Sequence, residues 1–146
     1  MLYIVPFFLQ GLAIFFDEFY FHHRRGLGTW EKVGHPLDTL TVLIGYLFLL
    51  FNSYSIANLY IFIGIAAFSS LFVTKDEFVH AELCDPAEHW LHALLFILHP
   101  LSFLSAALLW RNQLGENIIK LQSIVLGIFI LYQIIYWSRS WKTLRK

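Results

Sequence analysis

Most of the side chains that could do chemistry lie in two stretches of the chain, residues 17–38 and 75–92. Both stretches contain Asp-Glu-Phe close to their start, and both end with a histidine that is followed three positions later by another possible ligand. Together they hold six of the seven histidines and nine of the ten carboxylates. Neutral imidazole and carboxylate groups together suit iron, zinc, manganese and other first-row metals. The pattern therefore predicts a polyhistidine–carboxylate metal site built from two similar units.

Helical spacing indicates which of these side chains can act together, because residues three or four positions apart share one face of a helix. The predicted metal ligands form four such pairs: Glu18 with His22, His35 with Asp38, Glu77 with His80, and His89 with His92. Eight ligands are more than one zinc ion needs, and soluble di-metal bundles use the same Glu-x-x-His spacing that the third pair has. We therefore expect two transition-metal ions, iron in preference and zinc as the alternative.

Two further residues are expected to support these ligands. Glu88 and His99 are predicted to orient the ligands by hydrogen bonding or to serve as a general base. The alternative for Glu88 is a capping role with Asp85 at the start of a helix. His99 lies seven residues beyond His92, about two helical turns deeper on the same face. The alternative role for His99 is structural, as a buried histidine that is hydrogen-bonded to a neighbouring helix.

Other polar residues near the pairs have roles that the sequence leaves open. Either His22 or its neighbour His23 faces the site. His35 could cap a helix that starts at Pro36, where the missing N–H of proline is tolerated.

Two charged pairs occupy the first polar stretch. Arg24 and Arg25 are expected either to meet lipid phosphates or to hold an anionic substrate head group. Glu31 and Lys32 are expected to form a solvated pair in a loop.

The composition places this metal site in a membrane protein. The chain has 146 residues, of which 58% are hydrophobic and 14% charged, and its apolar runs of about 15 to 23 residues are long enough for transmembrane helices. The formal net charge is zero, which gives no basis for nucleic-acid binding. We expect an all-α membrane protein with five transmembrane helices, over residues 2–22, 36–51, 56–80, 86–110 and 116–137.

The basic residues predict the orientation of these helices. Eight of the ten Lys and Arg residues would lie on one side, with both polar stretches and the C-terminus: Arg24, Arg25, Lys32, Lys75, Arg139, Lys142, Arg145 and Lys146. The positive-inside rule assigns that side to the cytoplasm. The N-terminus is then outside, and the metal site faces the cytoplasm.

Internal similarity divides the single domain, residues 1–146, into two helix-pair units at about 1–52 and 55–110. Both units have the same orientation, and a fifth helix with a basic tail follows at about 116–146. Two alignments of the units remain open. Residues 35–38 correspond either to 89–92 or to 85–88.

The clustered histidines and four spans over roughly residues 1–110 make the chain similar in outline to the histidine-rich integral-membrane di-iron enzymes, the fatty acid desaturases and hydroxylases. The His-x-x-x-His and His-x-x-His-His boxes of that class are absent here, and carboxylates contribute instead. This resemblance implies oxygen activation on a lipid. The chain also resembles, equally loosely, membrane zinc hydrolases such as the alkaline ceramidases and the adiponectin-receptor group.

The expected function is that of a membrane-embedded di-metal oxidoreductase, acting on a lipid or another apolar substrate with a separate electron donor. The alternatives are a zinc-dependent membrane hydrolase and a non-enzymatic protein for metal transport, storage or assembly. Transport is disfavoured because three of the five helices carry few polar residues. Membrane lipid is an expected partner, and the fifth helix could mediate formation of a homo-oligomer.

The single cysteine, Cys84, excludes a disulfide within one chain.

Overall fold

The computed structural model describes residues 2–139, and these are helical throughout apart from short connections. The elements in chain order are η1 (Leu2–Ile4), α1 (Val5–Phe16), η2 (Asp17–His22), α2 (His23–Arg25), α3 (Thr29–Phe51), α4 (Ile56–Phe72), η3 (Val73–Asp76), α5 (Glu77–Leu83), α6 (Pro86–Arg111) and α7 (Glu116–Arg139). The basic residues Lys142, Arg145 and Lys146, which the orientation argument uses, lie outside the described part.

Five helical segments are long and apolar enough to cross a membrane: Leu2–Arg25, Thr29–Phe51, Ile56–Leu83, Pro86–Arg111 and Glu116–Arg139. The prediction of five spans in an all-helical chain is confirmed at this level. Large apolar side chains are exposed along all five, as expected of surfaces that face lipid instead of water.

The second span begins earlier than the sequence suggested. Its predicted start at Pro36 is wrong, because α3 begins at Thr29 and Pro36 lies inside the helix. The Gly28 N–H donates to the Glu31 carboxylate at 2.8 Å, which satisfies one of the free N–H groups of the first turn. The preceding turn passes through Gly26 at φ 83°, a conformation that glycine adopts without steric cost.

The early start of α3 removes the loop in which Glu31 and Lys32 were expected. Glu31 lies in the first turn of α3 and is fully buried, so its prediction as a solvated loop residue is wrong. Pro36 costs α3 one backbone hydrogen bond, which the remainder of a long helix accommodates.

The other helix bounds follow the sequence more closely. The third span runs to Leu83 and is interrupted by the 3₁₀ turn η3. The fourth begins at Pro86 after Asp85, as predicted, although the Asp85 side chain makes no cap hydrogen bond. A 3₁₀ turn is tighter than an α-helix, so η3 changes the direction in which the side chains of α5 project.

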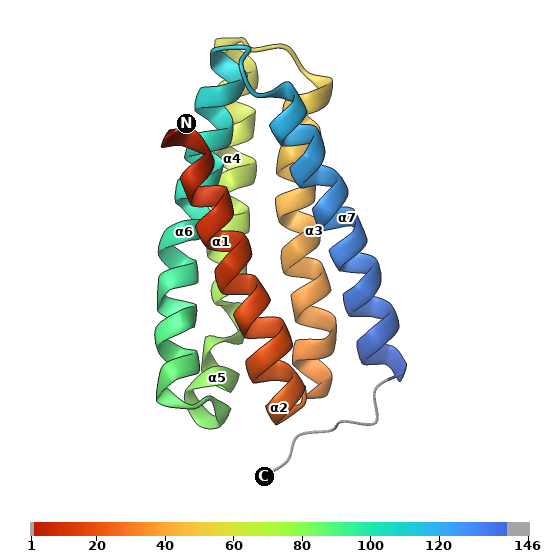
Figure 1. The fold of residues 1–146 in the computed structure, drawn as a ribbon. Coiled ribbons are helices and arrows are strands. Elements are labelled where there is room, and N and C mark those ends of the chain that lie inside the picture. Colours follow the sequence, from red (N-terminus) through yellow and green to blue (C-terminus); the bar gives the residue numbers. More distant parts are fainter. Residues whose placement is uncertain (1, 140–146) are drawn as a thin grey trace.

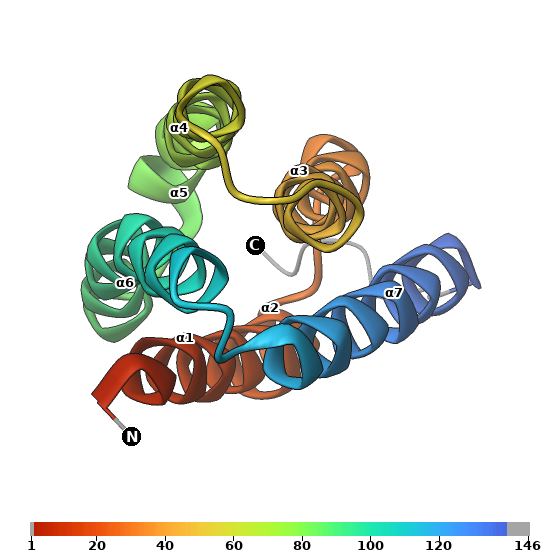
Figure 2. The same ribbon diagram turned by 90° about the horizontal axis from the view of Figure 1, so that it is seen from above.

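The helices run up and down in one bundle (Figure 1). Seen along its axis, α1, α6, α4 and α3 follow one another around the bundle, and α7 lies beside α3 and α1 (Figure 2). The main contacts join α3 to α7, α1 to α6 and α3 to α4. The short helices α2 and α5 lie at the same end of the bundle, which we call the α5 end.

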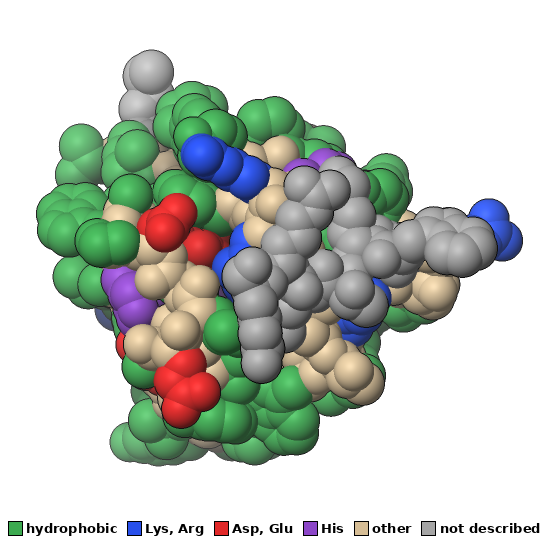
Figure 3. Space-filling view, turned by 90° about the horizontal axis from the view of Figure 1, so that it is seen from below, with side chains coloured by type: hydrophobic (Ala, Val, Ile, Leu, Met, Phe, Trp, Pro, Cys, Tyr) green, Lys and Arg blue, Asp and Glu red, His purple; other side chains and the backbone are tan. Residues whose placement is uncertain are grey.

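The two ends of the bundle differ in chemistry. Towards the end opposite α5, the core is aromatic, and Phe103 contacts Tyr46 and Phe62 edge-on with ring centroids 5.7 and 5.9 Å apart. A Cβ at Gly45 would lie 2.6 Å from the Phe103 ring, so glycine permits this close approach of α3 and α6. At the α5 end, charged residues and histidines lie within a rim of hydrophobic side chains (Figure 3).

Candidate metal centre

The first site residues come from a distorted part of the first span. Residues 17–22 form a π-helix, in which backbone hydrogen bonds join residues five positions apart and widen the helix. Residues four and five positions apart then come to the same side. Both Asp17 and Glu18 therefore approach His22, with oxygen-to-nitrogen distances of 3.3 and 3.6 Å. The sequence predicted only the pairing of Glu18 with His22.

Three other elements each supply one further histidine of the site. The first turns of α3 carry Glu31 and His35, α5 carries His80, and α6 carries His92. The π-helix, α3, α5 and α6 each contribute one imidazole ring, and all four meet at the α5 end. Segments that are far apart in sequence thus build one site.

The four imidazole rings form a closed quartet. His22 stacks on His35 with centroids 4.6 Å apart, and His80 lies 4.2 Å from His92. The two pairs face each other, with His22 6.4 Å from His92 and His35 6.2 Å from His80. All four side chains are largely or fully buried.

Four carboxylates surround this quartet. Asp17 accepts a hydrogen bond from His92 Nε2 at 2.8 Å. A Glu88 oxygen lies 3.7 Å from His22 Nε2, and a Glu31 oxygen lies 3.6 Å from His80 Nε2. The fourth is Glu18, which accepts a hydrogen bond from the α7 residue Trp137 at 2.6 Å. The quartet and these carboxylates are called the His–carboxylate cluster below.

Four groups of side chains in and beside the cluster have ligand atoms within 4.8 Å of one another: Asp17, His22, Glu88 and His92; Glu18, His22 and His35; Glu31, His35 and His80; and His80, Cys84 and His92. Each histidine belongs to two groups. The groups of possible ligands are therefore joined to one another through shared histidines.

Several buried histidine nitrogens in the cluster make no hydrogen bond to a described residue and are therefore available as metal ligands. Neither ring nitrogen of His22 or of His80 makes a hydrogen bond within the described structure, and nor does Nδ1 of His92. A buried polar atom without a partner costs about 1–3 kcal/mol, so several such atoms in one place require compensation. Neutral imidazole nitrogen is a common metal ligand, and a bound ion would supply that compensation.

Arg25 holds two of the carboxylates. Its guanidinium donates to Glu31 at 2.6 and 3.1 Å and to Glu88 at 3.1 and 3.3 Å. The capping role considered for Glu88 is replaced by this contact. The planar fork of arginine suits such paired recognition. Arg25 thereby joins the start of α3 to the start of α6 instead of projecting freely towards lipid phosphates. Its neighbour Arg24 is exposed and donates to Tyr20 at 3.1 Å.

Three predicted ligands lie apart from the cluster. Asp38 accepts hydrogen bonds from Lys75 at 2.7 Å, and Lys75 also binds Asp76. Glu77 is about half exposed, and its nearest partner is His89 at 3.9 Å. The structure therefore brings five of the eight predicted ligands together: Glu18, His22, His35, His80 and His92.

Sequence reasoning assigned no ligand role to Asp17, Glu31 and Cys84, and gave Glu88 only a supporting one. Asp17 enters because of the π-helix, which no simple spacing rule reveals. Glu31 enters because α3 starts at Thr29. A glycine followed three residues later by a glutamate was the available indication of that start.

The choice between His22 and His23 is decided by the packing of α7. His23 bonds the Tyr132 hydroxyl at 2.7 Å and stacks on Tyr136. His22 points into the cluster.

His99 belongs to a separate hydrogen-bonded chain deeper in the bundle. Gln10 donates to its Nδ1 at 3.2 Å, and its Nε2 contacts Ser69 at 3.0 Å. Ser69 in turn bonds Thr41 at 2.7 Å, so the chain joins α1, α6, α4 and α3. This is the buried histidine bonded to neighbouring helices that was the alternative for His99.

Cys84 lies at the C-terminal end of α5, next to the cluster. Burial raises the pKa of its thiol, and the nearby Glu88 carboxylate raises it further. Without a cation the sulfur is therefore a protonated thiol. Ligation by a metal requires the thiolate.

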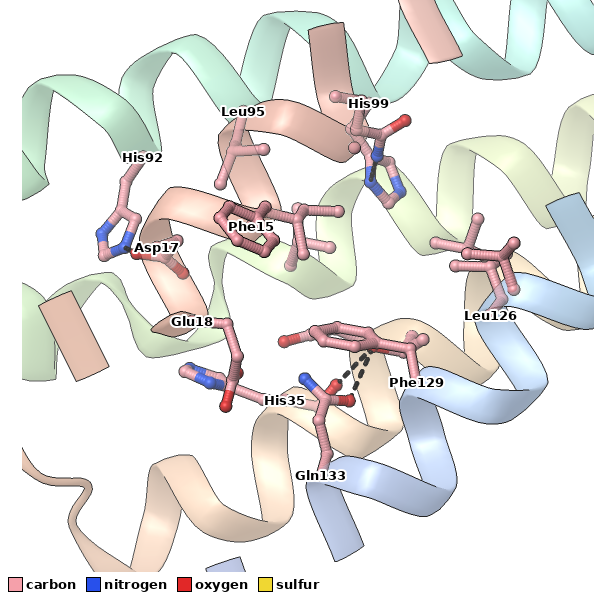
Figure 4. Close-up of a pocket in the computed structure, with 18 of the residues that line it drawn as sticks. Phe15, Asp17, Glu18, His35, His92, Leu95, His99, Leu126, Phe129 and Gln133 are labelled. Atoms are coloured by element: carbon pink, nitrogen blue, oxygen red, sulfur yellow. Dashed lines mark hydrogen bonds and ion pairs between the residues drawn. The ribbon is translucent and has the colours of Figure 1, made fainter. Parts of the chain in front are cut away.

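A cavity of 320 Å³ adjoins the cluster and extends into the bundle. One end is lined by cluster residues, among them Glu18, His35 and His92 (Figure 4). The other is lined mostly by apolar side chains of α1 and α7, including Leu126 and Phe129. The arrangement places possible metal ligands beside an apolar chamber.

No family model, no curated protein and no solved structure matches this chain.

Proposed function

We propose that this protein is a membrane-embedded di-metal oxidoreductase, with iron as the metal and a lipid or other apolar molecule as the substrate. One observation carries the proposal: a buried cluster of four histidines and four carboxylates opens onto a mainly apolar cavity. Histidine and carboxylate ligands suit iron, and an apolar chamber beside them would hold a hydrocarbon substrate.

The ligand groups suggest how two ions would be held. One ion would be held by Asp17, His22, Glu88 and His92, and the other by Glu31, His35 and His80. Glu18, which is grouped with His22 and His35, would be available to either ion. Bound iron in its reduced state would supply the electrons that activate dioxygen.

The surrounding residues orient these ligands. Arg25 fixes Glu31 and Glu88, and the Trp137 N–H fixes Glu18. Hydrogen bonds of this kind to metal ligands commonly change affinity or activity by about 10- to 100-fold. The apolar wall of the cavity limits the access of water.

The proposal includes an orientation and a partner. The α5 end lies at the cytoplasmic face, because most of the lysines and arginines are on that side. A separate electron donor acts from the same side. The two units of similar sequence remain a prediction within this proposal.

A zinc-dependent hydrolase is the second candidate, favoured by one specific feature. Cys84 lies within 4.8 Å of ligand atoms of His80 and His92, and zinc readily takes one thiolate with two imidazoles. Zinc-bound water would then be the nucleophile, and Glu88 would accept its proton.

The metal content of the purified protein separates the two candidates. We expect about two irons per chain in wild type, and a large loss in the variant His22→Ala, His80→Ala. The matched control is Glu77→Ala, His89→Ala, which removes two predicted ligands that lie outside the cluster. It should retain the metal.

Each outcome of this measurement has a defined meaning. Zinc in place of iron would favour the hydrolase. Loss of metal in the control alone would show that the cluster is not the site. Circular dichroism of each variant checks that the helices persist, and oxygen consumption with a chemical reductant then tests the redox activity of iron-loaded protein.

A further inference from the structure

The cavity beside the cluster reaches the outer surface of the bundle between α1 and α7. Its lining includes Gly11 and Phe15 of α1 and Val125 of α7, all of which are exposed on the apolar sides of their helices. A Cβ at Gly11 would meet no other atom within 4 Å. In a membrane these positions face lipid, so the cavity has a lateral entrance from the bilayer.

The size of the cavity limits what can enter. Its 320 Å³ lie at the lower end of the range for ligand pockets, roughly 300–1,000 Å³. Such a space holds one alkyl chain at a time and is too small for two chains side by side. The rest of a long chain can remain in the bilayer beyond the entrance.

The charges of the site select the head group. No lysine or arginine lines the cavity among residues 2–139, whereas Asp17, Glu18, Asp38 and Asp76 all do. Together with Glu31 and Glu88 these make six carboxylates. Arg25 binds Glu31 and Glu88, and Lys75 binds Asp38 and Asp76. The other two, Asp17 and Glu18, lie beside His22. Carboxylates therefore dominate the charge at this end of the cavity, and the lining from residues 2–139 offers no lysine or arginine to an anionic head group.

A neutral hydrogen-bond donor is present at the polar end of the cavity. Gln133 of α7 lines it near Glu18 and His35 (Figure 4). Its amide oxygen accepts from Thr39 at 2.9 Å, and its amide nitrogen makes no hydrogen bond to another described residue. This N–H group can donate to an oxygen atom of a head group without requiring that the head group carry a charge.

We propose that the substrate is a single-chain lipid with an uncharged, oxygen-bearing head group, such as a long-chain alcohol or aldehyde, which enters from the bilayer between α1 and α7. This inference rests on the proposed function, because it assumes that the cluster is the reacting centre. The head group lies beside Gln133 and the cluster, and the alkyl chain lies along α1 and α7.

Photolabelling tests this proposal. The protein is reconstituted into phosphatidylcholine vesicles with a long-chain primary alcohol that carries a diazirine, or with the fatty acid that carries the same diazirine. We expect the alcohol to label peptides of α1 and α7. The fatty acid should label them at least about tenfold less, corresponding to a discrimination of 1.4 kcal/mol.

Matched variants test the entrance. Gly11→Trp places a bulky side chain at the entrance, and Gly127→Trp makes the same change on α7 at a glycine that is equally free of neighbours but does not line the cavity. Val125→Trp and Ile124→Trp form a second such pair, of which only Val125 lines the cavity. Labelling should fall in Gly11→Trp and Val125→Trp and persist in the two controls.

Four outcomes are distinguishable. Equal labelling by the fatty acid would overturn the neutral head group, and equal labelling of all four variants would overturn the entrance. Iron-loaded protein that takes up neither probe refutes the lipid site while the metal function stands. The fourth outcome is a protein that binds no metal but is still labelled by the alcohol, with the labelling abolished in Gly11→Trp. That result would support the lipid site and refute the oxidoreductase.

Discussion

Burying four imidazole rings among four carboxylates costs free energy, because each polar atom that leaves water must find a partner. Arg25 compensates part of this cost. Its side chain is largely buried and bonds Glu31 and Glu88 together. Removing one partner of a buried ion pair leaves the other charge without compensation, which is more damaging than never having the pair.

We therefore expect Arg25→Gln to destabilise the protein by about 3 kcal/mol, in the range found for broken buried pairs. Thermal unfolding followed by circular dichroism measures this change. Arg25→Lys is the control, because lysine keeps the charge but lacks the planar fork, and it should lose less. Equal stability of wild type and Arg25→Gln would contradict the role assigned to the pair.

Trp137 is expected to position Glu18 through its N–H group. Trp137→Phe keeps an aromatic ring but removes the donor, so metal affinity should fall by about tenfold or more. Competition with a coloured chelator measures the affinity. The matched control is Trp90→Phe, at a tryptophan that is 72% exposed, and a similar loss there would refute the specific role of Trp137.

At the scale of elements, local irregularities of the helices position the ligands. The π-helix turns Asp17 and Glu18 towards His22. The 3₁₀ turn η3 precedes α5 and its His80. Gly34 allows α3 to approach η3, since a Cβ there would lie 2.9 Å from an Asp76 oxygen. Regular helices over the same residues would direct these side chains differently.

Deleting Tyr20 tests the π-helix, because removing one residue from a π-turn restores α-helical spacing. Asp17 and His22 would then be four positions apart, and the register of the preceding helix would rotate. We expect metal content to fall by about tenfold while helix content is retained. The substitution Tyr20→Ala, which removes the same exposed side chain but keeps the register, should bind metal normally. Normal metal content in the deletion variant would show that the π-helix is dispensable.

At the scale of the whole molecule, the cluster joins four of the five spans at one end, and Trp137 adds the fifth. A metal that binds there would therefore stabilise the entire bundle. Binding to the folded state alone adds about 4 kcal/mol when the free metal exceeds its dissociation constant a thousandfold.

Removing the metal with a chelator should lower the unfolding temperature, and adding ferrous iron should restore it. Magnesium is the control cation, because it prefers oxygen ligands. Tryptophan fluorescence during heating monitors the transition in detergent. An unfolding temperature that does not respond to chelator or iron would contradict a metal held between the spans.

The sequence alone predicts five apolar helices and one polar end that carries nearly all the histidines and carboxylates. These features follow from composition and from the length of the apolar runs, which are local properties. The start of the fourth span at Pro86 is equally local, because proline favours the first helical position. Five of the eight predicted ligands meet because they lie near helix ends on the same side of one bundle.

Only the tertiary structure decides which side chains form the cluster. The π-helix brings in Asp17, and the early start of α3 brings in Glu31. Packing of α7 against His23 leaves His22 to face the cluster. The direction in which each side chain points depends on how its helix is wound and rotated, and the even spacing of an ideal helix does not predict that direction.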